Sequence, residues 1–69
     1  MLPEVKTGQK WSTWVPGRQQ WLLATVIRHR DGMVTLKYDM RYGIRSGEEQ
    51  QTYEDSMLTN RNLFRFVEH

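Results

Sequence analysis

The chain has 69 residues, enough for one small domain near the lower size limit for independent folding. Its hydrophobic fraction of 38% and charged fraction of 26% are typical of globular chains, and the lack of cysteine excludes disulfides and thiolate metal sites. A net charge of +2 falls short of the basic clustering of dedicated nucleic-acid binders. No apolar run approaches the ~20 residues that span a bilayer. We therefore expect a cytoplasmic chain with no membrane contact, metal or cofactor.

The first half of the chain reads as short strands that end in turn signals. Residues 9–15 form the first predicted strand, which Pro16-Gly17 ends. Residues 21–30 give the clearest strand, and Asp31-Gly32 after it favours a tight hairpin because both residues tolerate positive φ. The third predicted strand, residues 33–39, alternates apolar and polar side chains.

The second half continues the pattern with one helical turn. A polar loop at residues 41–49 leads to a short predicted strand at residues 50–54. Residues 55–58 predict a single helical or 3₁₀ turn with an Asp or Ser cap. The last predicted strand covers residues 62–67, with Phe64 and Phe66 on one face.

Five short strands with tight turns indicate an all-β fold, a single small and partly open five-stranded barrel with a 3₁₀ turn before the last strand. Curling the sheet limits exposed edges in so short a chain. We expect this domain to cover residues 8–69 and residues 1–7 to be a flexible N-terminal tail. The expected core is Ala24, Val26, Val34, Leu36, Leu58 and Phe64 or Phe66, with one tryptophan, Trp11.

Three stretches resemble one family over roughly residues 8–67. They are Gly8-Gln9-Lys10-Trp11, Trp21-Leu22-Leu23-Ala24-Thr25-Val26 and Tyr38-Asp39-Met40-Arg41-Tyr42-Gly43. A glycine before the first strand, an Ala-Thr-Val strand and an aromatic turn make the chain similar to the Tudor-like branch of the SH3-like barrels. The resemblance implies a barrel with a short 3₁₀ element at residues 55–58.

The resemblance also implies a ligand site built from aromatic rings. Its positions correspond to Trp14, Trp21 or Leu22, Tyr38 and Tyr42, with Asp39 as a nearby acid. Such a cage attracts a methylated or other cationic group through contacts worth ~0.5–2 kcal/mol each. The chain departs from the family in the Tyr38-to-Tyr42 spacing, one residue longer than the commonest turn. The first strand is ambiguous by one position, and a shift of one residue would exchange which of its rings face the core. The opposing interpretation of the rings is that Trp11, Trp21 and Tyr38 simply pack the core.

The function expected from these residues is a non-catalytic binding module for a peptide or protein segment. One form of this hypothesis is that the segment carries a cationic or methylated side chain. One alternative is a nucleic-acid binder that uses the same rings with Arg18, Arg28, Arg30 and Arg41. The opposing interpretation is that Arg28, His29 and Arg30 form the ordinary solvated tip of a hairpin. A further alternative is a structural subunit whose rings form a homo-oligomer interface.

We expect no enzymatic activity. The acids near the fourth strand, Glu48, Glu49, Glu54 and Asp55, have no nucleophile or partner opposite them in the sequence pattern and are expected to form a solvated edge. Gln51-Thr52-Tyr53 resembles a segment of the small plasmid-borne dihydrofolate reductases. That match is only three residues long, and the first strand lacks the basic residues expected there.

Overall fold

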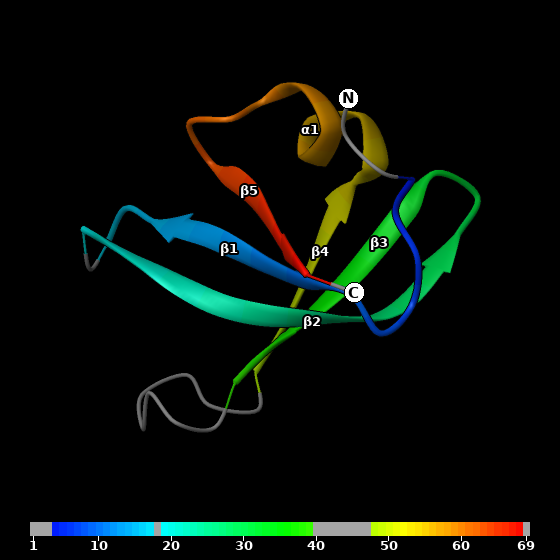
Figure 1. The fold of residues 1–69 in the computed structure, drawn as a ribbon, viewed down its shortest axis with the longest axis horizontal. Coiled ribbons are helices and arrows are strands. Elements are labelled where there is room, and N and C mark those ends of the chain that lie inside the picture. The colour runs from blue at the N-terminus through cyan, green and yellow to red at the C-terminus, as the bar shows by residue number, and fades with distance from the viewer. Residues whose placement is uncertain (1–3, 18, 40–47, 69) are drawn as a thin grey trace.

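Five antiparallel strands and one short helix make up a computed structural model of the protein, which describes residues 4–17, 19–39 and 48–68 (Figure 1). The expected all-β class is confirmed, and every strand lies within two residues of its predicted bounds. The elements are β1 (Lys10–Val15), β2 (Gln20–Arg30), β3 (Met33–Tyr38), β4 (Glu49–Tyr53), α1 (Glu54–Thr59) and β5 (Phe64–Glu68).

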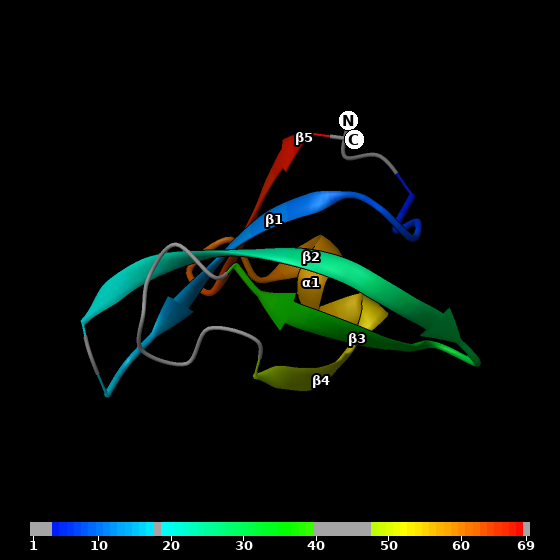
Figure 2. The same cartoon turned by 90° about the horizontal axis from the view of Figure 1, so that it is seen from below.

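The strands form one sheet in the order β4-β3-β2-β1-β5. Figure 2 shows this sheet strongly curved, with β5 and β4 at its two sides and α1 between them. Within the described residues the two edge strands are not hydrogen-bonded to each other, so the sheet is open. The structure therefore confirms a curved five-stranded antiparallel sheet but not its closure into a barrel.

The hairpin between β2 and β3 forms where the sequence predicts it. Asp31 has a φ of 53° and Gly32 a φ of 77°, which are the left-handed conformations that a two-residue hairpin turn requires. The backbone N–H of Glu54 donates a 2.9 Å hydrogen bond to the carbonyl of Gly32. This bond fixes the hairpin tip against the start of α1.

The core lies on the concave side of the sheet and contains most of the expected residues. Trp11 is fully buried there, and its ring meets Phe66 edge-on at 5.5 Å. Of the predicted core, only Leu58 and Phe66 remain partly exposed. The residues buried in addition are Val5, Val15, Leu22, Tyr38 and Met57.

The helical turn before β5 lies where the sequence predicts one, but its cap differs from the prediction. It is a six-residue α-helix, one of the two predicted types, and not the 3₁₀ turn expected for the barrel. Its N-cap is Tyr53, with no side-chain hydrogen bond, so neither Asp55 nor Ser56 caps it. Asp55 lies inside the first turn, where the helix dipole favours a negative charge. No helix within the described ranges is long and apolar enough to cross a membrane.

The segment before β1 is held at several points. Residues 1–3 of the expected tail lie outside the described part, but Val5 is only 1% exposed and belongs to the core. The buried Gln9 amide donates to the Glu4 carbonyl at 2.7 Å and accepts from the Lys6 backbone at 2.9 Å. The indole N–H of Trp11 donates to the same Gln9 oxygen at 3.1 Å. Gln9 thus links this segment to the core tryptophan.

Candidate functional site

Burial alternates along β1 and β2 and decides which way the tryptophans face. Trp11 and Thr13 are buried on the core side, whereas Ser12 and Trp14 are partly exposed on the other side. In β2, Trp21 is likewise partly exposed and precedes the buried Leu22. The one-residue ambiguity of the first strand is therefore resolved with Trp14 and Trp21 on the outer face of the sheet.

Trp14 and Trp21 form a cross-strand pair on that face. They are direct partners in the β1–β2 register, and their ring centres lie 5.6 Å apart with the planes tilted by 59°. This separation and tilt are typical of favourable aromatic pairs. Because both side chains remain partly exposed, their rings present an apolar surface to solvent.

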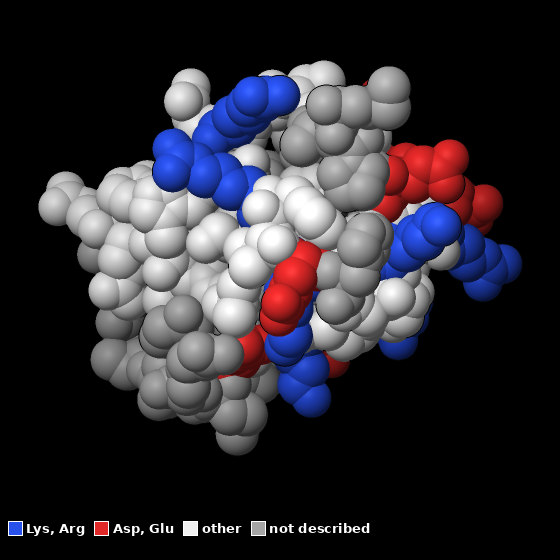
Figure 3. Space-filling model, in the orientation of Figure 1, with Lys and Arg blue, Asp and Glu red and all other residues white. Residues whose placement is uncertain are grey.

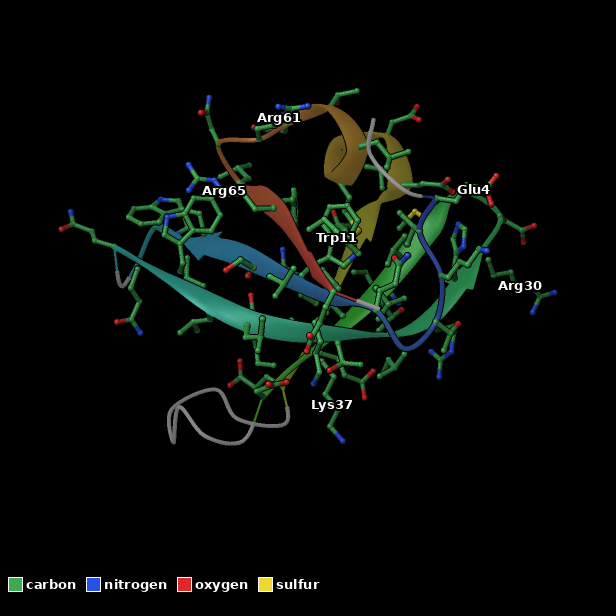
Figure 4. The ribbon with its side chains drawn as sticks, in the orientation of Figure 1. Glu4, Trp11, Arg30, Lys37, Arg61 and Arg65 are labelled. Carbon is green, nitrogen blue, oxygen red and sulfur yellow. The ribbon has the colours of Figure 1, made fainter. Side chains whose placement is uncertain are left out.

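Arg65 of β5 completes this surface. Its guanidinium carbon lies over the Trp21 ring, 4.3 Å from the ring centre, and its Nε donates a weak 3.4 Å hydrogen bond to the carbonyl of Arg61. Figure 4 shows Arg65 at the beginning of β5 and Arg61 on the loop before it. We call the surface formed by Trp14, Trp21 and Arg65 the tryptophan patch.

Tyr38 does not join the tryptophan patch. In the β2–β3 register it is the partner of Ala24, on the core side of the sheet, and it is 7% exposed. Its hydroxyl donates a hydrogen bond to the side-chain oxygen of Gln50. The expected set of rings is thus divided between the two faces of the sheet, while Tyr42 lies outside the described residues.

Asp39 is held by polar partners from the neighbouring strands. Its carboxylate pairs with Lys10 Nζ at 3.2 Å and accepts a 3.4 Å hydrogen bond from the Thr25 hydroxyl. Lys10 Nζ also donates to the Thr25 hydroxyl at 2.5 Å. Lys10 and Thr25 alternate with buried residues in their strands, so they lie on the same outer face of the sheet as Trp14 and Trp21. The acid expected beside a ligand cation therefore already neutralises a lysine of the chain.

Of the arginines expected to contact nucleic acid, the two that the structure describes lie away from the tryptophan patch. Arg28 and Arg30 are exposed at the hairpin end of β2, and Arg30 pairs with Asp31 at 3.4 Å. Arg28 lies seven positions after Trp21 along β2, roughly 23 Å at the usual rise. Arg18 and Arg41 lie outside the described residues.

The hairpin end carries a second surface feature, an open hollow beside α1. Its lining includes Gly32, Met33 and Tyr53, and the Tyr53 ring is 66% exposed. Next to it, His29 Nε2 contacts Glu54 Oε2 at 2.5 Å. Across the described parts of the chain, no three His, Asp or Glu side chains lie together in a way that could hold a metal ion.

Sequence reasoning did not identify Arg65 as a site residue. The alternation of β5 places it opposite Phe64 and Phe66, which indicates only that it faces solvent. Its contact with Trp21 depends on β5 pairing with β1, a register that no local pattern reveals.

Comparisons with protein-family models, curated proteins and solved structures found no match to this chain.

Proposed function

We propose that this protein is a non-catalytic binding module that recognises a peptide or protein segment through the tryptophan patch. The observation that carries the proposal is the cross-strand pair of Trp14 and Trp21, whose rings remain partly exposed on the face of the sheet away from the core. Tryptophan is enriched among the residues that dominate binding energy at protein interfaces. Two such rings held by a rigid sheet lose little conformational freedom when a ligand packs on them.

The fold adds a second part to the proposal, that the chain is a Tudor-like variant of the SH3-like barrels. Five antiparallel strands with one helical turn before the last strand support this resemblance. The cage that the resemblance implies would need Tyr38, which packs in the core instead. The proposed ligand contacts are therefore Trp14 and Trp21.

A protein ligand is favoured over a nucleic acid by the distribution of charge. The arginines at the hairpin lie roughly 23 Å from the rings, beyond the reach of one short segment. Arg30 is also paired with Asp31, and Lys10 with Asp39. Backbone phosphates would need several uncompensated basic side chains around the rings, and among the described residues Arg65 is the one that contacts a ring of the patch.

The test is an NMR titration that follows the three indole N–H signals. The probes are short peptides with a central leucine or tyrosine and varied flanking charge. Binding should shift the signals of Trp14 and Trp21, whereas Trp11 is fully buried with its N–H bonded to Gln9 and provides an internal reference. The proposal fails if no peptide moves the two outer indole signals at millimolar concentration.

Matched variants localise the binding. Trp14→Ser should weaken it about fivefold or more, because a ring at an interface centre contributes over ~1 kcal/mol. Tyr53→Ser removes a more exposed ring at the far end of the protein and should leave binding unchanged. Equal losses in the two variants would place the ligand elsewhere.

A further inference from the structure

We propose that the tryptophan patch selects an acidic protein segment and that Arg65 is the residue that reads its carboxylate. This inference rests on the proposed function and adds the charge of the ligand to it. It reverses the expectation from sequence, in which the rings would receive a cationic or methylated side chain.

The first argument is that a cation already occupies the ring face. The guanidinium carbon of Arg65 lies 4.3 Å from the centre of Trp21, well within the ~6 Å range of a cation–π contact. A ligand ammonium would have to displace this group and would then lie beside its positive charge. The chain's own residue therefore fills the place over Trp21 that a cage would offer to a ligand.

The second argument is the hydrogen-bonding capacity that Arg65 retains. A guanidinium has five N–H donors in one plane, and the Nε donor is directed to the Arg61 carbonyl. The donors of the two terminal nitrogens match the two oxygens of a carboxylate. Contact with the Trp21 ring limits the motion of the guanidinium, which lowers the entropy lost when a carboxylate binds.

The third argument is the absence of a compensating acid among the described residues. Their ion pairs involve Lys10, His29 and Arg30 but neither Arg61 nor Arg65. Figure 4 places Arg65 at the start of β5 and Arg61 on the loop before it. Figure 3, in the same orientation, shows blue atoms at these places with no red group against them. The positive charge beside the tryptophans is thus available to a partner.

The remaining charges favour one placement of an acidic segment. Acidic side chains gather at the opposite end of the sheet, around the hairpin and the start of α1, where Asp31, Glu54 and Asp55 line the hollow. Figure 3 shows a red group on that side, near the place that Figure 4 gives to Arg30. At the hairpin these acids lie among the exposed Arg28 and Arg30, and Asp31 is paired with Arg30, whereas Arg65 has no acidic partner among the described residues. Charge complementarity therefore favours the tryptophan patch for an acidic segment.

The experiment compares three series of short peptides that share a central tyrosine or leucine and carry glutamate, glutamine or lysine on both flanks. Wild-type protein should bind the glutamate series about two- to fivefold more tightly than the glutamine series, as expected for a solvent-accessible ion pair. The lysine series should bind most weakly. The preference should decrease as salt is raised, since salt screens exposed charges.

Three variants assign the preference to Arg65. Arg65→Gln should abolish the difference between the glutamate and glutamine series. Arg65→Lys should retain only part of it, because an ammonium lacks the planar pair of donors. Arg30→Gln makes the same change of net charge at the hairpin and should leave the preference intact. An unshifted Trp11 indole signal in each variant shows that the core is preserved.

The outcomes separate this inference from the proposed function. If no series binds, the proposed function itself fails. If peptides bind without a charge preference, or if lysine or trimethyl-lysine flanks bind best, only the acidic selection is wrong. The same holds if Arg65→Gln keeps the glutamate preference. Tighter, Arg65-dependent binding of a single-stranded oligothymidine than of any peptide would make nucleic acid the partner and overturn the inference.

Discussion

Arg65 on β5 extends across β1 to place its guanidinium carbon 4.3 Å from the centre of the Trp21 ring on β2. The two strands are not neighbours, since β1 lies between them. The residue opposite Arg65 on β1 is Ser12. The contact between Arg65 and Trp21 therefore depends on two strand pairings, that of β5 with β1 and that of β1 with β2.

The contact between Arg65 and Trp21 should be measurable as a coupling free energy. In a double-mutant cycle with Arg65→Ala and Trp21→Ala, we expect about 0.5–1 kcal/mol of coupling in the free energy of unfolding. Urea unfolding of the four proteins gives the value. A cycle of Trp21→Ala with Arg28→Ala, seven residues along the same strand, is the control and should give none. Equal coupling in the two cycles would contradict the contact.

Gln9 should be important for stability although it is polar. Gln9→Leu leaves the buried Trp11 N–H without its oxygen partner and removes both hydrogen bonds to the segment before β1. A buried donor without a partner costs about 1–3 kcal/mol, so we expect a loss of about 2–3 kcal/mol in chemical denaturation. Gln51→Leu makes the same change at an exposed position of β4 and should have an effect near zero.

The hairpin turn predicts that replacing Gly32 with alanine destabilises the protein more than replacing Gly17 with alanine. Gly32→Ala should destabilise the protein by about 1 kcal/mol, because its φ of 77° is strained for a residue with a Cβ. No atom lies within 4 Å of the added Cβ, so the effect is conformational rather than steric. Gly17→Ala is the control, since Gly17 also has open space but no positive φ. Thermal unfolding of both variants would reveal the difference, and equal melting temperatures would refute it.

Asp39 pairs with Lys10 in the structure, whereas the sequence led us to expect that it contacts a ligand, and one substitution separates these two roles. Asp39→Asn should lower the free energy of unfolding by about 1 kcal/mol, because the partly buried Lys10 loses its ion pair. Asp31→Asn is the control, since that ion pair is fully solvated and asparagine tolerates the turn conformation. Unchanged stability together with lost binding of lysine-flanked peptides would instead support the ligand role expected from sequence.

The order of the elements could be predicted because the signals are local. Asp31-Gly32 required a tight turn, and the alternation in β3 indicated which side chains share a face. The cap of the helix was not predicted. The helix begins after Tyr53 at the end of β4, and the N–H of Glu54 is bonded to Gly32, a contact between residues far apart in the sequence.

The sequence by itself determined the five strands and the tight hairpin, because alternation and turn chemistry act over a few residues. The tertiary structure alone decided which rings meet. Pairing of β1 with β2 brought Trp14 to Trp21, the face of β3 buried Tyr38, and pairing of β5 with β1 brought Arg65 over Trp21. These contacts depend on strand register, and a shift of one residue would turn every side chain to the other face.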